Sequence, residues 1–130
     1  MARTSENRVH PRLVVRLRAE YRAAGSKEWH EGTIHDLSAS GAALLTPVRL
    51  SPEALIDLRF RLPDGSEDAE SPIDVESLVL RTVAGSEVGG NVEFRAACHF
   101  LNLFGHSYER VRRYVFERTQ NTKVDSSTTR

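Results

Sequence analysis

The chain has 130 residues, which is the usual size of one globular domain. Its basic and acidic side chains both number 18, so the formal net charge is zero, which disfavours a non-specific polyanion binder. The single cysteine, Cys98, excludes an internal disulfide and a cysteine-rich zinc site. No apolar run is long enough to span a membrane and the polar first residues carry no secretion signal, so we expect a soluble, cytoplasmic domain without membrane insertion.

Six segments show patterns typical of β-strands. From Leu13 onward, apolar and polar residues alternate as in a strand with one buried face. The segment from Leu55 to Leu62 alternates in the same way and ends at the turn residues 63–66. Glycines, Gly85 among them, separate the last two segments, and Gly89–Gly90 is interpreted as a turn. The predicted strands are, in chain order, Leu13–Arg22, Trp29–Leu37, Ala42–Thr46, Leu55–Leu62, Ile73–Val83 and Val92–Phe100.

One helix is predicted after the strands. From Ser107 to Thr119 the apolar residues, including Val111 and Val115, recur at helical spacing, and Ser107 is a suitable N-cap. The polar segment 120–130 is predicted to be a disordered tail. Short strands, glycine-rich turns and one closing helix favour a mainly β fold, a small antiparallel barrel with a C-terminal helix across its open end.

Charge is distributed unevenly along the chain. Residues 1–22 carry six arginines against two glutamates, whereas residues 51–80 carry eight acidic side chains against two arginines. The acidic stretch Glu67–Glu70 is expected to form a loop or a hairpin tip. Basic charge concentrated in a short polar segment indicates a local anion site, and we expect residues 1–12 to form a flexible basic arm.

Patterns for catalysis or metal binding do not occur in the sequence. No two of the five histidines have the spacing of a helical metal-ligand pair, and the neighbours Cys98 and His99 would point to opposite faces of a strand. Ser38 lacks the flanking glycines of a nucleophile elbow, and no phosphate-loop fingerprint is present. We therefore predict a binding protein rather than an enzyme, with no metal and no cofactor.

Two motifs remain as candidates for a binding site. The first, Arg8-Val9-His10-Pro11-Arg12, carries little weight alone, because about two such arginine pairs are expected by chance in this composition, and Arg12 and Arg16 form another. The second, Asp36-Leu37-Ser38-Ala39-Ser40-Gly41, is informative, because only about 0.03 matches to Asp-x-Ser-x-x-Gly are expected. The second motif lies at a predicted strand–turn–strand junction, where a surface site is plausible.

The side chains of the two motifs suit a ligand with anionic phosphates and guanine-like bases. Asp36 can accept hydrogen bonds from the N1–H and amine of guanine, and the Ser38 hydroxyl can add a contact. Gly41 allows close backbone approach and a positive φ, while arginines bind phosphate or guanine bidentately. A structural explanation also stands beside this one: Asp36 and Ser38 would cap the turn, and Gly41 would satisfy its geometry.

Together these features resemble a PilZ domain. The resemblance rests on the order and spacing of the two motifs, on about six strands and a terminal helix, and on Pro11, Gly41–Leu44 and Arg113–Glu117, and it covers about residues 8–120. It implies a six-stranded PilZ-type barrel and, as ligand, the bacterial second messenger cyclic di-GMP. The ligand-binding residues that it implies are Arg8, Arg12, Asp36, Ser38 and Gly41. The chain departs from the family pattern at Asn7, where arginine often stands, and at Ala97, whose methyl group would crowd a ligand.

By this resemblance the chain is a single-domain receptor or adaptor, divided into an arm (1–12), a barrel with its helix (13–119) and a tail (120–130). Ligand binding would order the arm and pass a signal to a separate, unidentified protein, and a ligand-modulated homodimer is left open. One alternative is a PilZ-fold adaptor that needs no ligand, for example in pilus assembly or motility. Another, a barrel for single-stranded nucleic acid, needs exposed aromatic residues that this chain, 7% aromatic, lacks, so no DNA or RNA partner is expected.

Overall fold

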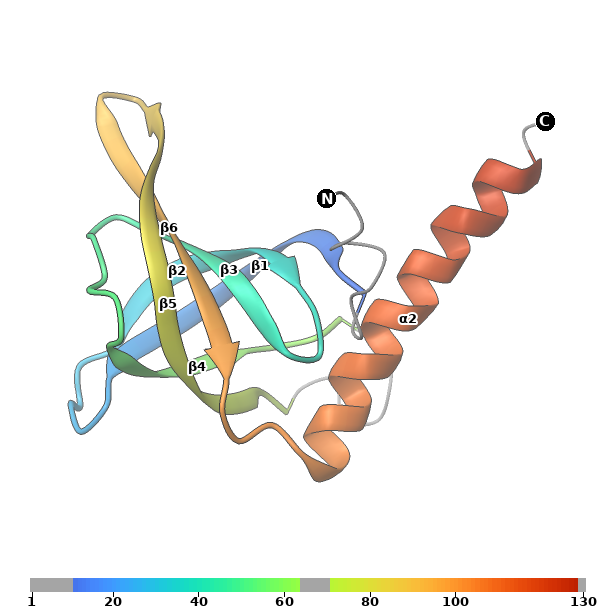
Figure 1. The fold of residues 1–130 in the computed structure, drawn as a ribbon, viewed down its shortest axis with the longest axis horizontal. Coiled ribbons are helices and arrows are strands. Elements are labelled where there is room, and N and C mark those ends of the chain that lie inside the picture. Colours follow the sequence, from blue (N-terminus) through green and yellow to red (C-terminus); the bar gives the residue numbers. More distant parts are fainter. Residues whose placement is uncertain (1–10, 64–70, 129–130) are drawn as a thin grey trace.

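Six antiparallel strands close into a barrel, and a long helix follows them (Figure 1). The computed structural model describes residues 11–63 and 71–128, and for Ser86, Val88 and residues 121–128 it describes the backbone alone. The order of the strands around the barrel is β1-β2-β3-β6-β5-β4. The predicted fold class is therefore confirmed. The elements are β1 (Leu13–Ala23), β2 (His30–Leu37), β3 (Gly41–Thr46), β4 (Leu55–Phe60), β5 (Ile73–Val88), β6 (Asn91–Phe100) and α2 (Gly105–Thr128).

The barrel core consists of the inward-facing residues of all six strands. In β4, Ile56, Leu58 and Phe60 are buried, whereas Asp57 and Arg59 between them face outward. This is the alternation that the sequence predicted, because successive side chains of a strand point to opposite faces. Each inward residue removes its apolar surface from water, and the alternating polar residues are left on the outer wall.

A β-bulge in β2 sets which of its residues face outward. The pairing of β2 with β3 shifts register between Ile34 and Asp36, so one residue, His35, is extra. Ile34 and Leu37 are consequently both fully buried although they lie three residues apart. The same shift leaves Asp36 between them on the outer surface, half-buried, just before the strand ends.

The hairpin of β5 and β6 is longer than the sequence predicted. Its turn is Gly89–Gly90, both with positive φ (58° and 84°), as expected. Gly85, however, lies inside β5 and does not separate two strands. It occupies a second bulge, between Ala84 and Glu87, where a Cβ atom would come within 3.1 Å of the Glu93 carbonyl oxygen. The glycine thus permits a close backbone contact within the ribbon.

The helix α2 packs its first turns against the barrel. Val111, Tyr114 and Val115 belong to the hydrophobic core, as the predicted helical spacing indicated. The buried Arg110 also attaches the helix, because its Nη1 donates a hydrogen bond to the carbonyl oxygen of Ser71 at 3.0 Å. The helix begins two residues before the predicted N-cap Ser107.

The helix also continues past its predicted end at Thr119. Its backbone is helical to Thr128, so the prediction of a disordered tail from residue 120 is wrong for 120–128. Propagating a helix from an already packed turn adds one hydrogen bond for each residue fixed, and this does not require an apolar face. Figure 1 shows this second half extending away from the barrel. The predicted arm, up to residue 10, and the acidic stretch Glu67–Glu70 lie outside the described residues.

Candidate ligand-binding site

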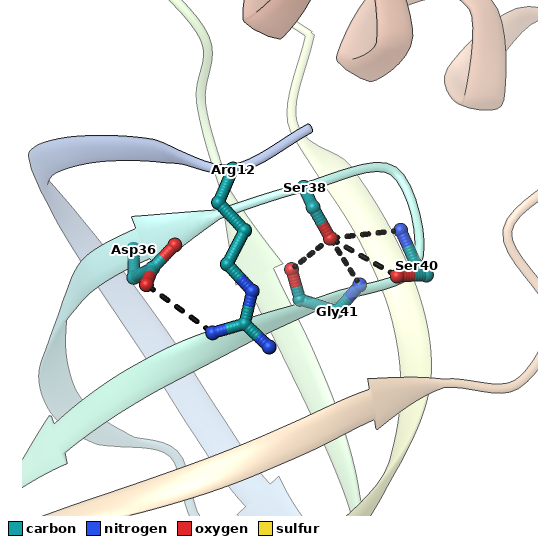
Figure 2. A network of polar contacts seen from close by, with 5 residues as sticks. All are labelled: Arg12, Asp36, Ser38, Ser40 and Gly41. Atoms are coloured by element: carbon teal, nitrogen blue, oxygen red, sulfur yellow. Dashed lines mark hydrogen bonds and ion pairs between the residues drawn. The ribbon is translucent and has the colours of Figure 1, made fainter. Parts of the chain in front are cut away.

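The second motif forms the tight connection between β2 and β3. The backbone N–H of Ser38 donates to the Gly41 carbonyl oxygen at 2.9 Å. The Ser38 hydroxyl oxygen accepts hydrogen bonds from the N–H groups of Ser40 and Gly41, at 3.1 and 3.2 Å, as Figure 2 shows. Ser38 is 4% exposed. Its hydroxyl therefore holds the turn closed, which is the structural explanation considered above.

Gly41 is required by the close approach of β6. A Cβ atom at this position would overlap the carbonyl oxygen of Cys98, which lies on the neighbouring strand. Gly41 is not among the glycines with positive φ, which in the described residues are Gly25, Gly89, Gly90 and Gly105. Of the two properties that a glycine permits here, the turn uses the close backbone approach and not the positive φ. The missing side chain serves packing between β3 and β6, and it also leaves the outer surface open beside the turn.

Asp36 and Arg12 meet on the outer surface beside this turn. Arg12 lies just before β1, and its Nη1 is 3.4 Å from Oδ2 of Asp36 (Figure 2). The Arg12 side chain is 52% exposed and the Asp36 side chain 14% exposed. Among the described residues this long ion pair is the one interaction of each side chain, so most of their hydrogen-bonding groups stay available.

These residues surround a small pocket of about 110 Å³ on the outer wall of β2, β3, β5 and β6. Four of the five predicted site residues line it, namely Arg12, Asp36, Ser38 and Gly41. The fifth, Arg8, lies outside the described residues. Pockets that enclose a drug-sized ligand usually measure about 300–1,000 Å³. A dinucleotide would therefore lie across this pocket and need a cover from elsewhere in the chain.

Two residues that the sequence did not point to also line the pocket, Leu80 and His99. Leu80 is 55% exposed because it follows the buried Val79 in the alternation of β5, and the register shift between Val79 and Arg81 leaves it without a partner on β6. Its neighbours Leu78 and Val79 made it look like part of a core strand, and no local signal marks the bulge. Ala97, the departure from the family pattern, does lie on the floor of the pocket, opposite Ala43.

A larger cavity lies elsewhere on the barrel. It measures about 860 Å³ and is formed by the outer faces of β1 and β2 with the ends of β3 and β6. Arg16 and Arg18 line it together with Glu31 and Glu93, so its charges are balanced. Arg16 thus lines a different cavity from Arg12.

The remaining reactive groups give no catalytic arrangement. No group of three potential metal ligands occurs within residues 11–63 and 71–128. Cys98 is buried and His99 exposed, so the two point to opposite faces as predicted. Burial raises the pKa of the Cys98 thiol to about 12, so it stays protonated and unreactive at neutral pH. Among the described residues, no helix combines the length and apolarity that crossing a membrane requires.

A family model confirms what the fold and the two motifs indicate. The model of the PilZ domain matches residues 6–117, and this chain therefore belongs to the PilZ domain family. The match includes Arg8 and extends into α2, so it covers both motifs and the whole barrel. No curated protein matches the chain significantly.

Solved structures share the fold at low sequence identity. The PilZ domain of Escherichia coli YcgR, solved with c-di-GMP, has a TM-score of 0.64 at 16% identity, and the match covers 92% of this chain and 98% of that one. Bacillus subtilis MotI/DgrA, an inhibitor of motility, has a TM-score of 0.72 at 17% identity, and the match covers 88% of this chain. K. pneumonia MrkH, a c-di-GMP-dependent transcription regulatory factor, has a TM-score of 0.69 at 17% identity, and the match covers 88% of this chain. The matched region spans 52% of the MotI and MrkH chains, about half their length.

Proposed function

We propose that this PilZ domain is a bacterial receptor for cyclic di-GMP. The observation that carries the proposal is the convergence of Arg12, Asp36 and the Ser38–Gly41 turn on one surface pocket. The Asp36 carboxylate would accept the N1–H and amine of a guanine, because its oxygens are only weakly engaged by Arg12. Arg12, and Arg8 from the arm, would bind phosphate oxygens or guanine through paired N–H groups.

The Ser38–Gly41 turn would contribute to ligand binding through the shape of its backbone more than through side-chain contacts. Ser38 holds the backbone of Ser40 and Gly41 in place, and its own donor bond, to the Gly41 carbonyl oxygen, is long at 3.3 Å. The hydroxyl can therefore rotate toward a ligand at small cost. Leu80, Ala43 and Ala97 add an apolar floor on which a purine ring would lie flat.

The mechanism that we propose is ordering of the arm by the ligand. The pocket is too shallow to enclose a dinucleotide, and Arg12 at its rim is half exposed, so residues 1–12 would fold over the bound ligand. Burial of the arginines against phosphate would offset the entropy lost by the arm. The changed surface would then be recognised by a separate cytoplasmic protein, and the chain would act as an adaptor rather than as an enzyme. Self-association on ligand binding remains part of this proposal.

Titration calorimetry of the full chain with cyclic di-GMP and with cyclic di-AMP tests the proposal. We expect heat at micromolar concentrations with the guanine compound and much weaker binding of the adenine compound. Arg8→Ala should reduce the affinity as strongly as Arg12→Ala, whereas Arg113→Ala on the exposed face of α2 should leave it unchanged. Wild-type affinity in both motif variants would show that the site is assigned wrongly.

A ligand-independent adaptor is the second candidate, and one observation favours it. Ser38 is satisfied within its own turn and Gly41 is required by the approach of β6, so both have a role without any ligand. Absence of binding to every cyclic dinucleotide, with a folded protein, would favour this function over the receptor.

A further inference from the structure

His99 lines the pocket, and no described contact of its side chain stabilises the fold. It is exposed on the outer face of β6 and pairs across the strands with Gly41 on one side and Leu78 on the other. Because Gly41 has no side chain, nothing on β3 covers that flank of the imidazole. Among the described residues, no hydrogen bond or ion pair involves the His99 side chain, and it lines the pocket together with Asp36.

The charges around His99 come from three of the elements that surround it. Arg12 and Asp36 face it across the pocket from β1 and β2, and they compensate one another. On β5, Glu76 and Arg81 lie on either side of the Leu78–Leu80 segment and carry opposite charges. β3 contributes no charged side chain to the pocket. A proton on the imidazole would therefore give a nearly neutral site a net positive charge.

An imidazole side chain ordinarily gains a proton between about pH 5 and 8. The neighbouring Cys98 cannot supply the same effect, because its pKa is raised to about 12 and its side chain faces the core. The two phosphates of a cyclic dinucleotide are anionic throughout this range, so their charge does not change. Among the described residues near the pocket, His99 and His35, the latter in the bulge beside Asp36, are the ones that carry an imidazole.

We infer that His99 is an additional, proton-dependent contact for the phosphates of the ligand, so that affinity for cyclic di-GMP rises as the pH falls. The inference rests on the proposed function and concerns the same pocket. A bound anion would favour the imidazolium, and by linkage, proton uptake on binding makes the affinity rise as the pH falls. The neutral imidazole can donate only one hydrogen bond, whereas the imidazolium donates two and attracts the anion.

Calorimetric titration with cyclic di-GMP at pH 5.5 and pH 8.0 tests this inference on the full chain. We expect wild type to bind about tenfold more tightly at pH 5.5, the size of one charge-assisted contact near the surface. His99→Gln should bind equally at both pH values, with the weaker affinity. His99→Arg should bind equally at both with the tighter affinity, because its charge is permanent. His35→Gln should keep the pH dependence of wild type.

Each of the other outcomes overturns the inference in an identifiable way. Equal wild-type affinity at both pH values would disprove the role of His99 and leave the receptor function intact. A pH dependence that is lost in His35→Gln and kept in His99→Gln would assign the effect to the bulge. If wild type binds no cyclic di-GMP at either pH while circular dichroism shows it folded, the receptor function fails and this inference fails with it.

Discussion

Two regions on opposite sides of the barrel both contain arginine–aspartate ion pairs, but the pairs differ in geometry and in role. On the outer wall of β1, β4 and β5, Arg22 pairs with Asp57 at 3.0 Å and Arg59 with Asp74 at 2.7 Å. The guanidinium carbons of both arginines also lie over the Trp29 ring, 4.4 and 4.6 Å from its centroid. We call these five residues the Trp29 cluster. On the far wall, Arg12 and Asp36 make one ion pair of 3.4 Å beside the pocket.

The difference distinguishes a structural network, in which each arginine contacts both a carboxylate and an aromatic ring, from a site whose arginine and carboxylate are weakly paired. In the Trp29 cluster each guanidinium is held through its Nε by a carboxylate and also lies over an aromatic face, which fixes the position of both arginines. The cluster also ties the first strand to β4 and β5, where the barrel closes. At the pocket the pairing is weak and long, so an incoming phosphate or guanine can replace it at little cost. Loss of an arginine should therefore affect stability on one wall and binding on the other.

Gly41→Ala should produce the largest effect, because it places a methyl group against the Cys98 carbonyl. The β3–β6 pairing must then separate, and we expect a loss of about 3 kcal/mol in the free energy of unfolding, measured by urea denaturation. Gly25→Ala is the matched control: its φ is +86° but no atom lies within 4 Å, so we expect about 1 kcal/mol. Equal losses in the two variants would contradict the close-approach explanation.

A reciprocal pair of arginine variants tests the comparison directly. Arg12→Ala should weaken cyclic di-GMP binding about 10- to 100-fold and change unfolding by less than about 0.5 kcal/mol, since the side chain is half exposed. Arg22→Ala should do the reverse, with about 1–2 kcal/mol lost in urea denaturation and no change in calorimetric affinity. If Arg12→Ala destabilises the fold as much as Arg22→Ala, the pocket is a structural network too.

Much of this architecture could be predicted from the sequence, because it depends on local periodicity. Alternation placed all six strands within a few residues, and the apolar spacing of α2 identified Val111 and Val115 as core residues. The rarity of the Asp-x-Ser-x-x-Gly pattern also located the turn that forms the pocket. These features can be predicted because each depends on residues that are neighbours in the chain.

What could not be predicted depends on strands that are distant in sequence. Gly41 is required by Cys98, more than fifty residues later, and nothing near Gly41 indicates this contact. Leu80 and His99 reach the pocket through strand register, and Leu80 lies at a bulge that leaves it without a partner on β6. The continuation of α2 beyond Thr119 has no apolar pattern, because that part of the helix has no barrel surface beneath it.

Removal of the aromatic ring should destabilise the fold about as much as Arg22→Ala and leave ligand binding unchanged. Trp29→Ala abolishes both guanidinium–ring contacts while leaving the two ion pairs in place, so we expect about 1–2 kcal/mol less stability to urea. Trp29→Phe keeps a ring face and should lose less than half as much. Affinity for cyclic di-GMP should be the same as in wild type for both variants. A weakened affinity in Trp29→Ala would mean that the two walls of the barrel are coupled.

Asp36→Ala should have the smallest effect, and it should concern selectivity rather than total binding. The phosphates would still bind the arginines, but the acceptor for the N1–H and amine of guanine would be gone. We expect the preference for cyclic di-GMP over cyclic di-AMP to fall by about 1 kcal/mol, measured by parallel calorimetric titrations. Asp57→Ala, which removes a carboxylate from the Trp29 cluster, should keep the preference of wild type. An equal loss of affinity for both dinucleotides in Asp36→Ala would instead assign this carboxylate to positioning Arg12, through the ion pair that joins them.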